Sequence, residues 1–298
     1  FIKFYILFSN YYIMSKINKI FIESFFKKSG SDCDFKTELE ETIATSDKAV
    51  CYIDDIVLPN VFKTIDSRNN KLYLTISILN IKSNTIIILD DGYYNGFSFA
   101  EEITKKLKVY TDYITQSGLL IAFDVTAAYD LLSNTITFRY INKTNDPPPM
   151  PNPIVITIHS NKDLLNGSYE SKPLNIYEIR SINETIGNIE KSIILENDKL
   201  VHNCILNLAT LKSIYLFCSE LSSNDTISNF QQNNIIKKII LNSSQNEINI
   251  TQAGNNVDYL TINKRLLKSL NFKLCDKFGT VLDLYGHSIS FTITIINK

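Results

Sequence analysis

The sequence predicts an all-β fold, and three observations lead to it. About a dozen short segments alternate between apolar and polar residues, which is the period of a strand with one buried face. Polar turn residues separate these segments, and only one stretch has clear helical spacing. In the closing segment 289–295, four apolar side chains share one face, whereas serine and threonine side chains share the other. The predicted fold is an antiparallel β-sandwich, a single jelly roll with one packed helix and loop insertions.

The first half of the chain contains three predicted strands and the helix. Alternation predicts the strands at 49–59 and 72–78, and a continuous apolar run predicts a short strand at 86–89. Ser98 and Glu101 have the spacing of a capping box, so the helix is predicted to begin at Ser98. Its apolar side chains form a single stripe, which predicts packing against a sheet; they are Ala100, Ile103, Leu107 and Tyr110.

The second half returns to strands. Segments 119–127 and 136–140 are predicted to form a hairpin that turns around Asn134. The segment DPPPMPNP, 146–153, is stiff and extended because each proline fixes φ; it is either a domain linker or a long loop between sheets. A short helix is expected within 174–182. Further strands are expected at 192–195, 201–208, 214–218, 235–241 and 257–262.

The chain opens on an apolar, aromatic stretch, FIKFYILFSNYYI at 1–13, followed by Met14. It lacks the small-residue cleavage site of a signal peptide and is too short for a membrane span. We therefore expect 1–13 to be upstream read-through. The domain expected after it is one jelly roll over 14–298, with an insertion or second lobe around 146–190. No other stretch approaches a transmembrane segment.

Net charge and cysteine content argue against a nucleic-acid-binding protein and against a fold held by disulfides. The 298 residues carry 30 Lys and Arg against 31 Asp and Glu, a formal net charge of -1, so direct binding of nucleic acid is not expected. The 5 cysteines contain no CxxC pair, and we expect reduced thiols that pack as small apolar side chains. They are Cys33, Cys51, Cys204, Cys218 and Cys275.

No constellation of residues with catalytic or metal-binding spacing is present in the sequence. His159, His202 and His287 lie far apart, and none has metal-ligand spacing. Paired acids occur at Asp54-Asp55 and Asp90-Asp91; the first pair ends a strand and the second opens a turn. A calcium site at the second pair needs more oxygen ligands than its neighbours offer. We expect no catalytic residue, no metal and no cofactor.

The closing stretch nevertheless has a recognisable order of motifs. SLNFKLCD, KFGT and LDLYGHSISFTITI follow one another, and this order resembles the end of the single jelly-roll minor capsid, or penton, proteins of Polinton/Maverick elements, adintoviruses and virophages. The matching residues are Asp276, Gly279, Asp283, Leu284, Gly286 and Ser290. DDGYYNGFSFAEEITKKL, LKSIYLFCSELSSND and the stretch 35–58 are similar to earlier parts of that family, so the resemblance covers most of 33–296.

The resemblance implies a structural protein of the virion that is not an enzyme. Five copies would form a ring at an icosahedral vertex, next to the double jelly-roll major capsid protein, after assembly inside the host cell. A ring of this kind uses two different surfaces of each subunit, since every contact is head to tail. The family offers no catalytic residue to carry over, and the sequence does not assign interface residues.

Two other classes of function stay open at this point. A ligand- or glycan-binding β-sandwich, lectin-like or receptor-binding, would use an exposed aromatic loop, for which Tyr93, Tyr94 and Phe97 around Gly92 and Gly96 are candidates. Packing of these aromatic side chains against the sheet is the simpler interpretation. A jelly-roll enzyme of cupin type would need several histidines and a glutamate around a metal, and 3 histidines without the spacing do not meet that need.

Overall fold

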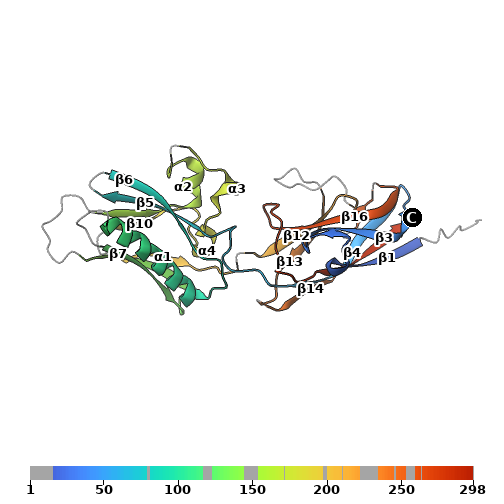
Figure 1. Ribbon diagram of the computed structural model, residues 1–298, viewed down its shortest axis with the longest axis horizontal. Coiled ribbons are helices and arrows are strands. Elements are labelled where there is room, and N and C mark those ends of the chain that lie inside the picture. Colours follow the sequence, from blue (N-terminus) through green and yellow to red (C-terminus); the bar gives the residue numbers. More distant parts are fainter. Residues whose placement is uncertain are drawn as a thin grey trace, which may run out of the picture. The chain divides into compact units, whose positions relative to one another are not determined.

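The computed structural model describes residues 16–78, 81–116, 123–143, 154–170, 172–196, 200–209, 211–221, 234–244, 246–252, 259–262 and 264–297. The segments 1–13 and 146–153 lie outside these residues. The chain divides into two compact units (Figure 1). The jelly-roll unit is built from Phe1–Phe62 and Leu211–Lys298, and the inserted unit is Lys63–Thr210. The expected insertion around 146–190 thus falls inside a unit that already begins at Lys63.

The jelly-roll unit consists of two antiparallel sheets that lie as two layers (Figure 1). Sheet A has the order β1 (Lys16–Glu23), β17 (Ser290–Asn297), β4 (Val50–Pro59) and β14 (Ile248–Gln252), and β15 (Leu260–Thr261) also pairs with β4. Sheet B has the order β13 (Ile235–Ile240), β12 (Ser213–Cys218), β16 (Leu266–Cys275), β3 (Asp34–Ala44) and β2 (Ser29–Gly30).

The strand order identifies the topology. Leaving out the two-residue strands, the strands of this unit run along the chain as β1, β3, β4, β12, β13, β14, β16 and β17. Sheet A contains the first, eighth, third and sixth of them, side by side in that order; sheet B contains the second, seventh, fourth and fifth. This interleaving is that of a jelly roll, two Greek keys wound together. The predicted fold class is confirmed, and the inserted unit occupies the connection between the third and fourth strands.

Apolar side chains from the inner faces of sheets A and B form the core of this unit. Ile289, Phe291, Ile293 and Ile295 are all buried, as their alternation predicted. Phe291 packs edge-on against Phe272 of β16, with ring centroids 5.0 Å apart. Burying one such side chain stabilises the fold by roughly 1.5–3 kcal/mol. Strand β17 therefore lies in the middle of sheet A, paired with β1 on one side and β4 on the other.

The connection 276–289 crosses from sheet B to sheet A, and two turns shape it. In the first turn, the Asp276 carboxylate accepts hydrogen bonds from the N–H groups of Phe278 (2.8 Å) and Thr280 (3.0 Å). Gly279 has a φ of 76°, a left-handed conformation that glycine adopts at low cost. Asp276 and Gly279, two of the residues that carry the sequence resemblance, therefore form the turn together.

The second turn contains the remaining motif of this connection. The Asp283 carboxylate accepts a hydrogen bond from the Tyr285 N–H at 2.7 Å, as in an Asx turn. Tyr285 and Gly286 have φ values of 52° and 85°. Leu284 is buried in the core. The motif D-L-x-G thus specifies a turn anchored by one apolar side chain.

Glu220, just beyond β12, is a buried carboxylate. It accepts hydrogen bonds from the Asn271 backbone N–H (3.0 Å), the Asn271 side-chain amide (3.0 Å) and the Ser219 hydroxyl (2.8 Å). The Lys264 ammonium lies 3.4 Å away. Burial acts to raise the pKa of Glu220, but the hydrogen bonds and the lysine charge outweigh it and lower the pKa to about 2. As a carboxylate, Glu220 ties the end of β12 to β16.

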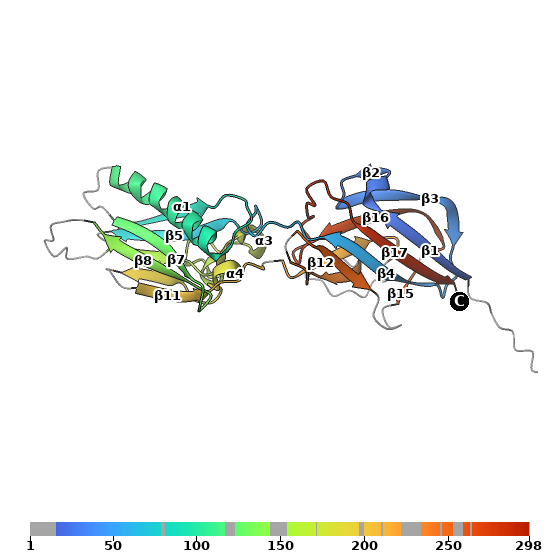
Figure 2. The same cartoon turned by 90° about the horizontal axis from the view of Figure 1, so that it is seen from below.

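The inserted unit also has two antiparallel sheets. One has the order β10 (Ile193–Glu196), β9 (Val155–Ile158), β5 (Lys71–Ile78) and β6 (Ile81–Ile88); the other has the order β11 (Leu200–Ile205), β8 (Thr135–Asn142) and β7 (Phe123–Asp130). Helix α1 (Gly96–Gln116) lies alongside β7 (Figure 2). The short helices are α2 (Asn161–Asn166), α3 (Ile176–Ile179) and α4 (Asn183–Ile186) in this unit and η1 (Ser24–Phe26) in the jelly-roll unit.

Helix α1 begins at Gly96, so the start predicted at Ser98 is wrong. Asn95 caps the helix: its side-chain oxygen accepts a hydrogen bond from the Ser98 N–H (2.9 Å), and the Ser98 hydroxyl accepts one from the Asn95 N–H (3.0 Å). A Cβ at Gly96 would lie 2.4 Å from the Tyr129 ring, so a larger residue there would require the Tyr129 side chain to move. The predicted apolar stripe is confirmed, with Ile103 and Leu107 in the core.

Candidate assembly surface

The histidines do not form a site within the described residues. His159 is buried, and its Nε2 lies 2.7 Å from the Thr75 hydroxyl oxygen. That hydroxyl donates its own hydrogen to Asn84 (2.7 Å), so Nε2 must carry the proton and donate. Burial lowers the pKa of His159, which keeps the ring neutral. His287 is an exposed residue of the jelly-roll unit. The side chain of His202 lies outside the described residues.

Four of the five cysteines are free and buried, as predicted for packing residues. Burial raises the pKa of the Cys33 and Cys51 thiols to about 12 and that of Cys275 to about 11. Cys218 shifts in the same direction. A thiol with a raised pKa is a poor nucleophile and metal ligand, because both roles need the thiolate. The Cys204 side chain lies outside the described residues.

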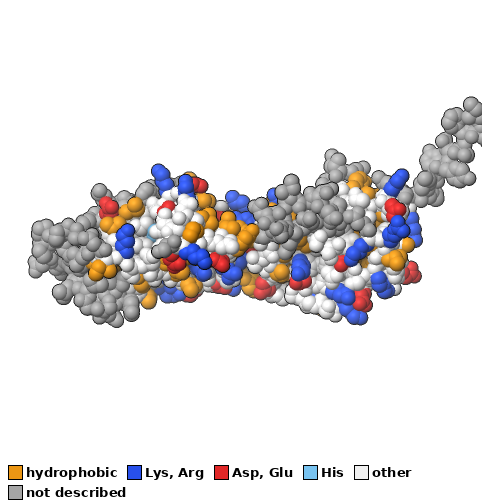
Figure 3. All heavy atoms as spheres, turned by 90° about the horizontal axis from the view of Figure 1, so that it is seen from above, with side chains coloured by type: hydrophobic (Ala, Val, Ile, Leu, Met, Phe, Trp, Pro, Cys, Tyr) orange, Lys and Arg blue, Asp and Glu red, His pale blue; other side chains and the backbone are white. Residues whose placement is uncertain are grey.

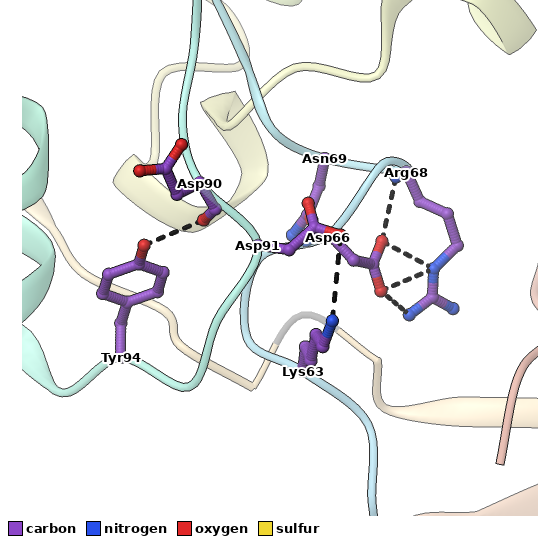
Figure 4. Close-up of polar contacts among 7 residues, drawn as sticks. All are labelled: Lys63, Asp66, Arg68, Asn69, Asp90, Asp91 and Tyr94. Carbon is purple, nitrogen blue, oxygen red and sulfur yellow. Dashed lines mark hydrogen bonds and ion pairs between the residues drawn. The ribbon is translucent and has the colours of Figure 1, made fainter. Parts of the chain in front are cut away.

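The paired acids Asp90 and Asp91 form ion pairs with lysines, and Figure 4 shows the pair between Asp91 and Lys63. Asp90 lies 2.5 Å from the Lys106 ammonium, which lowers the pKa of the carboxyl by hydrogen bonding. Asp91 lies 3.9 Å from Lys63. The backbone carbonyl of Asp90 accepts a hydrogen bond from the Tyr94 hydroxyl at 2.8 Å. The contacts of Asp90 hold the segment between β6 and α1 against the helix, which is a structural role.

A second ion pair lies in the same region (Figure 4). Asp66 is largely buried, and its two carboxylate oxygens accept hydrogen bonds from the Arg68 guanidinium, with Nε at 2.9 and 3.0 Å. Asn69 accepts a hydrogen bond from the Asp66 N–H at 2.9 Å. In the part of the chain that the structure describes, no group of three or more His, Cys, Asp and Glu side chains has the arrangement of a metal site.

The aromatic loop that sequence analysis singled out is partly packed. Tyr94 contacts Phe99 with ring centroids 5.9 Å apart, and Phe97 contacts Tyr129 at 5.1 Å, both edge to face. Tyr93 and Phe97 remain about half exposed, at 49% and 55%. The loop therefore packs against the sheet and helix of the inserted unit while leaving two aromatic side chains accessible.

Apolar side chains are exposed at both edges of sheet A. The register places outer-face residues in rows that cross all four strands: Glu23, Ser290, Val57 and Ile250 in one row, and Phe21, Thr292, Asp55 and Gln252 in the next. At the β1 edge, the exposed apolar side chains are Ile17, Phe21, Phe25 and Phe26, called here the β1 patch. At the β14 edge they are Val57, Ile248 and Ile250, called the β14 patch.

The two patches are unusually open for their residue types. Phe21, Phe25 and Phe26 are 77%, 72% and 77% exposed, and the rings of the last two pack edge to face. Ile248 and Ile250 are both 61% exposed. Figure 3 shows one face of the protein, on which apolar side chains lie among charged ones. Clustered exposed apolar side chains mark binding surfaces in soluble proteins. Sequence analysis did not predict either patch.

Between the two patches, an ion pair covers the middle of the outer face of sheet A. The Lys19 ammonium of β1 lies 2.8 Å from the Asp54 carboxylate of β4, so this ion pair passes over β17, which lies between those strands. Thr292 and Thr294 of β17 are buried as a result, although their alternation predicted a wetter face. The ion pair therefore separates the two patches.

A comparison with solved structures finds a protein of similar fold. A crystal structure of the selenomethionine-labelled mavirus penton protein is similar to this chain, with a TM-score of 0.50 over 94% of this chain and 98% of that chain, at 10% sequence identity. This chain shares its fold with the mavirus penton protein. The resemblance inferred from the closing motifs is thereby confirmed at the level of the fold. Because the inserted unit is about half of this chain, an alignment of that coverage includes both units.

No protein-family model and no curated protein matches the sequence. The likeness to the mavirus penton protein is therefore a likeness of structure, at 10% sequence identity. Among the described helices, none combines the length and the apolar character needed to cross a membrane.

Proposed function

We propose that this chain is a viral structural protein, a minor capsid or penton protein of the kind found in Polinton/Maverick elements, adintoviruses and virophages. Five copies form a closed ring at a vertex of an icosahedral capsid, beside the double jelly-roll major capsid protein. The protein then resides in the virion after assembly in the host cell. The observation that carries this proposal is the shared fold with the mavirus penton protein, which extends over 94% of this chain and includes the inserted unit.

The histidine, cysteine and acidic side chains that could carry out chemistry are instead buried or paired, which supports a structural role. His159 and four cysteines are buried in the cores, and the paired acids at 90–91 are engaged by lysines. The surface of the jelly-roll unit presents apolar patches instead, which is what assembly through side-to-side contacts requires. We do not expect this protein to be an enzyme or to need a cofactor.

Light scattering of the purified chain across a concentration series tests the proposal. The expected result is a discrete species with five times the 34.0 kDa mass of one chain. The second arm is co-expression with the major capsid protein of the same virus, in which the chain should be recovered in the assembled shells. A chain that stays monomeric and is also absent from those shells would contradict the proposal.

A second candidate function is a ligand-binding module, and the exposure of Tyr93 and Phe97 favours it. The inserted unit would then bind a glycan or receptor through this loop. A glycan array probed with the chain tests this function, with a Tyr93→Ala and Phe97→Ala double variant for comparison. Binding that the double variant loses would support the candidate, and an array without specific signals would remove it.

A further inference from the structure

We propose that the β1 patch of one copy of this chain binds the β14 patch of the next copy. This inference rests on the proposed function and assigns the two surfaces of the ring contact to named residues. The patches lie at opposite edges of the same sheet, since β1 and β14 are its first and last strands. A cyclic assembly needs two such different surfaces on each subunit, facing opposite neighbours.

The apolar side chains of the two patches are of complementary kinds. The β1 patch presents three phenylalanines within the six residues 21–26, and the β14 patch presents branched aliphatic side chains, Val57, Ile248 and Ile250. Aromatic side chains are enriched near the centres of protein interfaces, where they pack into pockets of the partner. At 72–77% exposure, each phenylalanine still has most of its surface to bury.

Charges around the two patches have opposite sign, which indicates a second copy as the occupant. Residues 16–28 at the β1 edge contain four lysines and one glutamate, a formal charge of +3. Residues 54–59 and 246–252 at the β14 edge contain Asp54, Asp55 and Glu247 and no lysine or arginine, a formal charge of -3. The Lys19–Asp54 pair within each copy cancels one charge on each side. Two further lysines of the β1 edge contact acids outside the counted range, Lys27 with Asp32 and Lys28 with Glu38, so the negative charge of the β14 edge is the larger of the two.

The lysines nearest the phenylalanines already contact acids in their own copy. Lys27 lies 2.8 Å from Asp32, and Lys28 lies 3.3 Å from Glu38. The Lys28–Glu38 pair is exposed, with side-chain exposures of 64% and 40%, and exposed pairs contribute only about 0–1 kcal/mol. Lys28 can therefore turn toward Glu247 or Asp55 of a neighbour at little cost, and so can Lys16, which has no ion pair with another residue that the structure describes.

The test uses two double variants of the full chain. The β1 variant is Phe21→Ser with Phe26→Ser, and the β14 variant is Ile248→Ser with Ile250→Ser. All four side chains are exposed, so both variants should keep the melting temperature and circular dichroism of the wild type. The matched control is Leu132→Ser with Ile205→Ser, which removes two exposed apolar side chains from the inserted unit and should leave the pentamer unchanged.

Head-to-tail contact predicts a specific result when the variants are mixed. Each variant alone should be monomeric, because every copy has lost the same patch and no intact β1 patch can meet an intact β14 patch. An equimolar mixture should form a dimer of twice 34.0 kDa and nothing larger, since one intact β14 patch meets one intact β1 patch and the remaining patches are defective. Contact between two identical patches would instead let one of the variants dimerise by itself.

Carbodiimide cross-linking of the wild-type assembly provides a second measurement. This reagent joins a lysine to a carboxylate in direct contact through an amide bond, with loss of water to the reagent. Cross-links between Lys16 or Lys28 and Asp55 or Glu247 are expected. Mixing copies with and without 15N labelling identifies links that join two chains. Links confined to single chains would contradict the proposed contact.

The outcomes separate this inference from the proposed function. If the wild type is a pentamer and either double variant remains one, the patch contact is wrong while the penton role stands. The patch would then face another occupant, such as the major capsid protein or another segment of this chain. A mixture of the two variants that stays monomeric also overturns the contact. A wild-type chain that is monomeric in solution and also absent from the co-expressed shells would overturn the proposed function itself.

Discussion

The buried carboxylate of Glu220, which belongs to the segment LKSIYLFCSELSSND, stabilises the jelly-roll unit. Glu220→Gln removes the charge but keeps the shape, and we expect it to lower the free energy of unfolding by about 1–3 kcal/mol at pH 7. The folded-state pKa of about 2 is below the ordinary 4.5, so the stabilisation is present above pH 4.5 and is lost as pH falls toward 2. Chemical denaturation at several pH values should show the difference between the two proteins shrinking over that range.

His159 should give the inserted unit a pH dependence of its own. Burial lowers its folded-state pKa below the ordinary 6.5, so the unfolded chain takes up a proton first as pH falls. Stability should then decrease below pH 6.5, by at most about 1.4 kcal/mol per pH unit for one proton. Asp163 acts weakly against this shift. His159→Gln keeps a donor toward Thr75 and should flatten the profile of melting temperature against pH; an unchanged profile would contradict the assignment.

At the scale of elements, the cap of helix α1 offers a comparison between two possible starts. Asn95→Ala removes the side chain that accepts the Ser98 N–H, and should cost about 1 kcal/mol of stability. Glu101→Ala is the matched control, because Glu101 is exposed and would be the partner if the helix began at Ser98. It should change stability by less than about 0.5 kcal/mol. The reverse order of the two effects, measured by thermal unfolding, would restore the start predicted from sequence.

Strands with one buried face were predictable from the sequence, and strands without one were not. Strands β4, β5 and β17 alternate cleanly because a core lies on one side of them. Strand β3, DFKTELEETIA, buries only Phe35, so its period is hidden among charged residues. Strand β14 has exposed isoleucines on one face and a buried asparagine between them, which inverts the usual pattern. Both missed strands are held by pairing with distant partners, β16 and β4.

For the molecule as a whole, two separate cores predict two unfolding transitions. The buried cluster around Phe272 contains no residue of the inserted unit, and that around Phe138 contains none of the jelly-roll unit. Phe272→Ala and Phe138→Ala should each cost about 3–5 kcal/mol, and each should lower only one of the two transitions in calorimetry. A single transition that both variants shift equally would show that the units unfold together.

The boundaries of the inserted unit could not be read from composition. Strand-forming segments lie on both sides of Lys63, β4 ending at Pro59 and β5 beginning at Lys71. The proline-rich segment 146–153, at which the boundary was predicted, lies well inside the unit. The β1 and β14 patches could not be predicted from the sequence, because they depend on which strands become the edges of sheet A, a result of pairing between residues as distant as Lys16 and Asn297.

The position of β17 between β1 and β4 also sets an order of events during synthesis on the ribosome. The inserted unit, 63–210, is contiguous in the chain and can fold as soon as it has emerged. Sheet A cannot close then, because β17 follows every other strand of this sheet in the chain. Strands β1 and β4 must wait for β17, and until it arrives the two patches do not sit on one sheet. We therefore expect nascent and truncated chains to be unable to enter a ring, so that only subunits whose translation has reached β17 are incorporated.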